Sequence, residues 1–232
     1  SQVELRLLAH FSEDANLLEA FRQGQDIHRA VAAQVNGVPL EQVTSAQRSA
    51  AKAVNFGIIY GQTAFGLSRS LGISSSEAKA FIDAYFARYP GIRAFIDKCV
   101  KEARESGYAQ TILGRRRPIA ELTSRNRGQV QFGERIAVNT VVQGSAADLI
   151  KVAMINIHNL IKSKKLKTKM ILQVHDELVF EVPDGELGPD HLVERVAPRD
   201  RADLAARVAF IPVIGARGVA AEALDDLEAL AH

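Results

Sequence analysis

Apolar residues in the first half of the chain recur mostly at the three- and four-residue spacing of amphipathic helices. The chain alternates briefly at its start and then takes on this helical spacing. Glycine and proline residues interrupt the helical pattern at several points. Ser74 to Ser76 followed by Glu77 is a typical helix start. Helices are expected within segments 1–23, 26–37, 39–61, 63–72, 74–92 and 93–107.

The second half of the chain mixes helical and strand patterns. Segment 130–165 predicts one long helix. Segments 108–119 and 169–183 predict β-hairpins, the first with a basic tip and the second with apolar arms. The pattern therefore predicts an α/β chain that is mainly helical with β-hairpins.

Composition narrows the class of protein only a little. The chain has 232 residues, of which 47% are hydrophobic, enough for one large domain or two small ones. A net charge of +2 makes no strong case for nucleic-acid binding, so that case depends on local clusters. A single cysteine, Cys99, allows no disulfide within the chain and fits a reducing cytoplasm. No apolar run reaches membrane-spanning length, and phosphate-loop, dinucleotide-loop and zinc-ligand spacings are absent from the sequence.

The stretch "RSAAKAVNFGIIYG" at 48–61 carries a row of functional side chains on a small, apolar background. Arg48, Lys52, Phe56 and Tyr60 recur every four positions, so they form one slowly winding stripe on a helix. Two cations followed by two rings suit a ligand with phosphates at one end and a flat base at the other. Alternatively, the cations lie on a solvated face and the rings pack in a core.

A second row of polar side chains lies in the predicted long helix. Arg135, Asn139 and Gln143 are again four positions apart and can all donate hydrogen bonds. Such donors suit the DNA minor groove, where the base pairs offer similar acceptors. The alternative is an ordinary polar helix face.

Both predicted hairpin tips carry charge. The "LGRRRP" tip places three guanidinium groups, those of Arg115, Arg116 and Arg117, beside a glycine turn. This suits contact with backbone phosphates or simply a solvated basic turn. The other tip holds His175, Asp176 and Glu177. Two carboxylates suit Mg²⁺, although acidic residues are also common in turns.

Taken in order, these segments resemble the polymerase region of the family A DNA polymerases. "RSAAKAVNFGIIYG" is similar to the fingers-helix motif of that family, and "LQVHDELVFEVP" to its third motif. "SQVELR", "GYAQTILGRRRPI" and "ERIAVNTVVQGSAADLIKVAM" also resemble segments of the family. The resemblance implies the fingers and part of the palm of a right-hand polymerase fold. Residues 1–21 would begin the palm segment after the first motif, 22–117 would form the fingers, and 118–183 the palm with the HDE hairpin.

The resemblance also implies a function, which is template-directed DNA synthesis from deoxynucleoside triphosphates by two-metal phosphoryl transfer with Mg²⁺. Primer-template DNA would be the partner of a monomeric, nucleoid-associated enzyme of the bacterial cytoplasm, with no membrane contact. The resemblance further implies roles for single residues. Arg48 and Lys52 would bind the phosphates near His28, with Lys52 as the general acid.

Phe56 would stack by the sugar and base, Tyr60 would guard the template position, and Glu4 would lie against the sugar and exclude ribonucleotides. Asp176, beside Glu177, would bind the metal. The residues that would contact DNA are Arg115, Arg116, Arg135, Asn139, Gln143 and His175.

The chain departs from the family pattern at both ends. The first motif of the family reads Asp-Tyr-Ser-Gln, and this chain starts at the serine, so the isolated chain is expected to be catalytically inactive and part of a longer polymerase. A non-catalytic DNA-binding remnant is the alternative function. Residues 184–232 lack the expected Gly-x-Asn-Trp segment, through a frameshift or through divergence. Helical pieces are expected there, with a strand remnant at "FIPVIGARG".

Overall fold

The computed structural model describes residues 2–174, 177–183, 186 and 208–212. The chain divides into two compact units, one of residues 4–145 and one of residues 1–3 with 146–232. The division falls inside the longest helix. The predicted boundary between fingers and palm at 117 and 118 is a functional division and stays a prediction.

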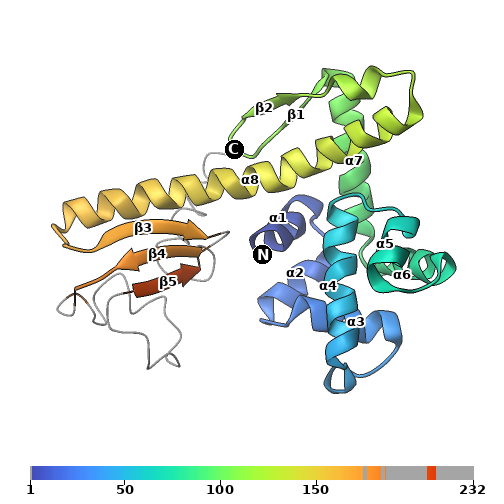
Figure 1. The fold of residues 1–232 in the computed structure, drawn as a ribbon, viewed down its shortest axis with the longest axis horizontal. Coiled ribbons are helices and arrows are strands. Elements are labelled where there is room, and N and C mark those ends of the chain that lie inside the picture. Colours follow the sequence, from blue (N-terminus) through green and yellow to red (C-terminus); the bar gives the residue numbers. More distant parts are fainter. Residues whose placement is uncertain (1, 175–176, 184–185, 187–207, 213–232) are drawn as a thin grey trace. The chain divides into compact units, whose positions relative to one another are not determined.

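The unit of residues 4–145 is built mainly of helices, as the periodicity predicts. Most of them begin at a capping side chain or end at a glycine, as described below. The elements in chain order are α1 (Gln2–Ser12), α2 (Ala15–Arg22), α3 (Ile27–Asn36), the 3₁₀ turn η1 (Leu40–Gln42), α4 (Ser45–Ile59), α5 (Ala64–Leu71), α6 (Ser75–Arg88) and α7 (Pro90–Ser106) (Figure 1).

Local signals in the sequence set several of these helix ends. Ser74 and Glu77 form a capping box, in which the Ser74 Oγ accepts from the Glu77 N–H at 3.2 Å. Pro90 is the first residue of α7, where its missing N–H is not needed. Gly107 ends α7 in the left-handed conformation, with a φ of 79°. The predicted start at Ser74 and stop at Gly107 are therefore confirmed, whereas α7 begins at Pro90, three residues before the expected segment 93–107.

The start of the chain differs from its pattern. The brief alternation suits a strand, but helix α1 already begins at Gln2. Leu5, Leu7 and Leu8 are all nearly inaccessible to solvent. A helix that is enclosed on several sides does not confine its apolar residues to one face. Enclosure by neighbouring helices thus explains why the first apolar positions alternate, although the helices expected within 1–23 are confirmed.

The core of this unit joins helices that are distant in sequence. It contains Leu8 of α1, Val31 of α3, Ile58 of α4 and Tyr85 of α6, each at most 5% exposed. Cys99 of α7 belongs to the same cluster. Burial raises the pKa of its thiol to about 12. The cysteine is therefore a packing residue, in agreement with its apolar surroundings.

The first predicted hairpin is confirmed and packs on the long helix α8 (Arg127–Ser163). Strands β1 (Tyr108–Gln110) and β2 (Arg116–Pro118) are antiparallel, and the short 3₁₀ helix η2 (Ala120–Thr123) follows. The backbone N–H of Ile112 donates to Oγ of Ser145 at 2.9 Å. A Cβ at Gly144 would lie 2.6 Å from Cγ2 of Thr111, so only a glycine admits the hairpin this closely.

The unit of residues 1–3 with 146–232 contains the end of α8 and a small antiparallel sheet of order β3-β4-β5 (Figure 1). Strands β3 (Lys169–Val174) and β4 (Glu177–Glu181) form the second predicted hairpin, and β5 (Val208–Pro212) pairs with β4. Ile150 and Ile157 of α8 pack against Leu178 and Phe180. Strand β5 agrees with the expected strand remnant, whereas the expected helical pieces of the tail lie outside the described residues.

Candidate nucleotide-binding site

The predicted stripe lies on one face of α4. Thr44 caps this helix, because its Oγ1 accepts a hydrogen bond from the Gln47 N–H at 3.2 Å. In turn, Oε1 of Gln47 accepts a hydrogen bond from the Thr44 N–H. Arg48 and Lys52 are exposed, and Phe56 and Tyr60 are half-buried. The opposite side packs into the core through Ala51, Val54, Gly57 and Ile58. The predicted separation of a polar stripe from an apolar face is confirmed.

The aromatic end of the stripe is a short stack of rings. The Phe56 ring centroid lies 5.8 Å from that of His28 and 6.1 Å from that of Tyr60. The planes of Phe56 and Tyr60 differ by only 18°. Rings spaced in this way offer flat faces to a sugar or a base.

The Tyr60 hydroxyl ties α4 to α1. It donates to Oε2 of Glu4 at 2.7 Å. Burial raises the pKa of Tyr60, and the bond to Glu4 raises it further, whereas a hydrogen bond with Gln143 of α8 acts to lower it. Glu4, Tyr60 and Gln143 therefore converge, although they come from three separate helices.

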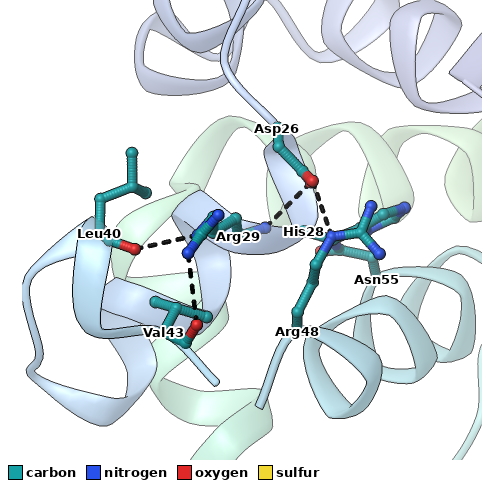
Figure 2. A network of polar contacts seen from close by, with 7 residues as sticks. All are labelled: Asp26, His28, Arg29, Leu40, Val43, Arg48 and Asn55. Atoms are coloured by element: carbon teal, nitrogen blue, oxygen red, sulfur yellow. Dashed lines mark hydrogen bonds and ion pairs between the residues drawn. The ribbon is translucent and has the colours of Figure 1, made fainter. Parts of the chain in front are cut away.

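The cationic end of the stripe faces the start of α3. Nε of Arg48 donates to Oδ2 of Asp26 at 2.7 Å (Figure 2). Nδ1 of His28 lies 2.9 Å from Nδ2 of the buried Asn55. The structure thus brings His28 beside Arg48, as the resemblance implies.

The imidazole of His28 is neutral at physiological pH. Burial lowers its pKa to about 4, the charge of Asp26 opposes this shift, and the positive charges of Arg48 and Lys52 add to it. Because Nδ1 is engaged by Asn55, Nε2 is the ring nitrogen left to face a ligand.

The donor row on α8 runs beside the end of α4. A Cβ at Gly61 would lie 2.6 Å from Cγ of Arg135, so the arginine stem packs directly over this glycine. At the other end of the row, Gln143 reaches Tyr60. Asn139 lies between them and is half-buried, and its buried Oδ1 has no hydrogen-bond partner among the residues that the structure describes. The predicted stripe and donor row therefore adjoin in one region.

A cavity of about 540 Å³ opens beside the aromatic end of the stripe. Phe56, Tyr60, Gln62 and Arg135 line it, together with small residues of α4 and α5. Its lining is mostly apolar with one cation, which suits a flat heterocycle attached to a phosphate.

The basic hairpin differs from the prediction of a three-arginine tip. Only Arg115 lies in the turn, because Arg116 and Arg117 belong to strand β2. Successive strand residues point to opposite faces, so these guanidinium groups do not share one surface. Nη2 of Arg115 donates to the Gly144 carbonyl at 3.0 Å, and Arg116 lies over the Tyr108 ring. Arg115 therefore contacts the long helix α8, and Arg116 makes a contact within the hairpin.

The second hairpin tip is only partly described. Glu177 begins β4 opposite Val174 and is exposed, whereas His175 and Asp176 lie outside the described residues. Within the described part of the chain, no group of three or more His, Cys, Asp or Glu side chains could hold a metal ion. The predicted metal ligand Asp176 stays a prediction.

Among the helices of the described residues, none has both the length and the apolarity needed to cross a membrane.

Comparison with known proteins decides the family. Residues 1–197 match the profile described as DNA polymerase family A. The chain belongs to DNA polymerase family A. It is 51% identical over 198 residues to DNA polymerase I of Bacillus subtilis (strain 168), a match that covers 85% of this chain and 22% of that protein. It is 48% identical over 196 residues to DNA polymerase I of Pseudomonas aeruginosa, covering 84% of this chain and 21% of that protein.

A solved structure of the family A polymerases agrees with the fold. It is the POL domain of Pol1 from M. smegmatis in complex with DNA primer-template and dNTP. The likeness has a TM-score of 0.77 at 48% identity and covers 80% of this chain and 33% of that one. The predicted class, a mainly helical part of a polymerase fold with small antiparallel sheets, is confirmed. The chain spans only about a fifth of the length of the curated relatives it matches.

Two residues of the site are missed by sequence reasoning. From its place before "IHRA", the sequence predicts for Asp26 only that it starts a helix. Asn55 is a polar residue within the otherwise apolar side of the α4 pattern, and that inconsistency is the one signal that could have found it. Asn55 is completely buried, and its contact with Nδ1 of His28 explains why this buried position is polar.

Proposed function

We propose that this chain provides the fingers and part of the palm of a polymerase that performs template-directed DNA synthesis. The single observation that supports this most is the arrangement of α4, whose exposed cations and half-buried rings follow one another along one face. His28 and the donor row of α8 border that face. A deoxynucleoside triphosphate has the same order of groups, with phosphates at one end and a base at the other.

Each side chain of the stripe has a proposed role in binding and proton transfer. Arg48 and Lys52 offset the charge of the triphosphate, and neutral His28 adds a hydrogen bond. The primer 3′ oxygen forms a bond to the α-phosphorus while the bond from that phosphorus to the bridging oxygen breaks. Lys52 gives a proton to the departing pyrophosphate as general acid.

The aromatic end sets the position of sugar and base. Phe56 stacks by the incoming nucleotide, and Tyr60 guards the template position beside the cavity. Glu4 lies against the sugar and excludes ribonucleotides, while its bond to Tyr60 fixes its direction. On the DNA side, the proposed contacts with primer-template are those of Arg115, Arg116, Arg135, Asn139, Gln143 and His175.

Mg²⁺ is the proposed cofactor, with two ions in the complete enzyme. The carboxylates of Asp176 and Glu177 fit it, because Mg²⁺ prefers hard oxygen ligands and takes few from protein. When bound, the ions supply activation of the primer hydroxyl and neutralisation of the pyrophosphate charge. We propose that the polymerase acts as a monomer in the bacterial cytoplasm, at the nucleoid.

The test is Lys52→Ala in a full-length polymerase containing this sequence. The expected result is a fall of about 10²–10⁴-fold in the rate of single-nucleotide incorporation, with primer-template affinity nearly unchanged. Lys98→Ala is the control, since Lys98 is an exposed lysine of α7 that pairs only loosely with Glu102 at 3.9 Å. Equal losses of incorporation and DNA affinity would favour the alternative, a non-catalytic DNA-binding remnant.

A further inference from the structure

Asp26 joins the start of α3 to the first turns of α4. Its Oδ1 accepts from the Arg29 N–H at 3.1 Å and so caps α3. Its Oδ2 accepts from Nε of Arg48 at 2.7 Å (Figure 2). One carboxylate therefore makes two contacts with different purposes, one to backbone and one to a cation of the stripe.

The neighbouring contacts make Asp26 part of a braced segment. Nε of Arg29 donates to the Leu40 carbonyl at 3.0 Å, and its Nη2 to the Val43 carbonyl at 3.5 Å. These bonds hold η1 and the approach to α4 against α3. The Asp26 backbone is itself held, because its carbonyl accepts from the Ala30 N–H at 2.8 Å.

The charge of Asp26 is retained in this setting. Burial is the largest influence on its pKa and acts to raise it. The hydrogen bonds from Arg48 and Arg29 and the charge of Arg48 act against burial, as does the charge of His28 at acidic pH, and the net result is a lowered pKa. The side chains of Arg48 and Asp26 are 45% and 38% exposed, and a pair this exposed contributes little to folding stability.

Orientation of the arginine is a better explanation for the contact. A guanidinium is planar and carries five N–H groups in a rigid fork, of which the ion pair uses the one on Nε. Holding that edge fixes the direction of the two terminal nitrogens, which are the donors for a bidentate phosphate contact. It also restricts the rotamers of the arginine before a ligand arrives, so less side-chain entropy is lost on binding.

We propose that Asp26 is a positioning residue that holds the Arg48 guanidinium in place for the triphosphate of an incoming deoxynucleotide. This inference rests on the proposed function, and it adds a residue to which neither the motifs nor the family resemblance gave a role. The carboxylate acts through Arg48 and does not touch the nucleotide.

The test measures binding of dATP and of inorganic tripolyphosphate to the 232-residue chain by calorimetry in the presence of Mg²⁺. Asp26→Asn and Asp26→Ser should each weaken both ligands by about five- to tenfold, because the affected group binds phosphate. In an Arg48→Met background the same substitutions should change affinity less than about twofold, because their effect passes through Arg48.

Two controls separate positioning from folding. Asn and Ser cap helices about as well as Asp, so the unfolding midpoint should move by no more than about 2 °C, whereas Asp26→Ala loses the cap as well. Glu134→Gln removes a matched ion pair, in which Arg104 and Glu134 lie 2.6 Å apart with exposures of 45% and 35%. It should leave dATP affinity unchanged.

The outcomes distinguish this inference from the proposed function. If the unaltered chain binds both ligands and the Asp26 variants bind them equally or more tightly, the positioning role is wrong and the nucleotide site stands. A loss that persists undiminished in the Arg48→Met background would also overturn the positioning role. If the unaltered chain binds neither ligand, the proposed nucleotide site fails and this inference fails with it.

Discussion

Tyr60 donates a 2.7 Å hydrogen bond to Glu4, a residue 56 positions earlier in the chain. The bond joins the last residue of the α4 stripe to α1. Because Tyr60 follows Ile59, the end of α4, its backbone is no longer held by the full helical ladder. A side-chain tether at this point therefore fixes a ring that the helix alone does not.

Removing the Tyr60 hydroxyl tests this tether. Tyr60→Phe should lower the free energy of unfolding by about 1–2 kcal/mol, since the hydrogen bonds with the Glu4 carboxylate and with Gln143 are lost. Urea unfolding monitored by circular dichroism measures the change. Glu4→Gln should cost less, because the amide oxygen still accepts. If the two substitutions together cost the sum of their separate effects, the bond does not couple these residues.

The pKa of His28 predicts a specific pH dependence of stability. The folded value of about 4 lies below the unfolded value of 6.5, so the unfolded chain binds more protons between these pH values. Stability should therefore fall as the pH drops through this window. The ring is only half-buried, and solvent screening reduces the expected loss to about 1 kcal/mol.

Comparing the unaltered chain with His28→Gln isolates that contribution. The difference between their unfolding free energies should shrink from pH 7 to pH 4.5, since glutamine does not titrate. An NMR titration of the His28 ring gives a second readout, with an expected midpoint near 4. A midpoint near 6.5 would contradict the burial that lowers this pKa.

Gly61→Ala tests the packing of Arg135 over the end of α4. Gly61 has a φ of 65°, and the added methyl would meet Cγ of Arg135 at 2.6 Å. The left-handed backbone alone costs an alanine about 1–2 kcal/mol, and displacement of the arginine adds to this. Thermal unfolding measures the total.

Gly72→Ala is the matched control for that experiment. Gly72 has a φ of 68° and no atom within 4 Å of the position of its Cβ, so it reports the backbone cost without the contact. Gly61→Ala should be the more destabilising of the two, and an added Arg135→Ala should remove the excess. Equal costs at both glycines would show that Arg135 moves aside freely.

The capping box at Thr44 sets where the stripe begins. Thr44→Ala should lower the free energy of unfolding by about 1 kcal/mol, because the N–H of Gln47 loses its acceptor. Thr44→Ser keeps the hydroxyl and should be nearly neutral in the same denaturant titration. A similar loss for both variants would assign the effect to the methyl group and not to the cap.

Local chemistry explains which features of this chain were predictable. The box at Ser74 and Glu77 and the left-handed Gly107 depend on neighbours a few residues away, so the sequence reveals them directly. The stripe on α4 was predictable because a four-residue repeat on one helix maps directly onto one face. The enclosure of α1 depends on helices far along the chain, so local spacing does not explain the brief alternation at its start.

Pairings between distant segments were not predictable in the same way. Asp26 and Arg48 are 22 positions apart, and only the packing of α3 against α4 brings the carboxylate to the guanidinium. The meeting of Gln143 with Tyr60 depends likewise on the tertiary arrangement. The hairpin arginines show the converse, because their run of three suggested one patch, whereas strand alternation directs Arg116 and Arg117 to opposite faces.

The burial of Cys99 makes this protein convenient for site-specific labelling. It is the single cysteine of the chain, it is 5% exposed, and its thiol is protonated at neutral pH. Maleimide dyes react with accessible thiolates, so they would pass over it in the folded protein. A cysteine introduced at an exposed position such as Ser76 would accept one fluorophore without prior removal of the native thiol.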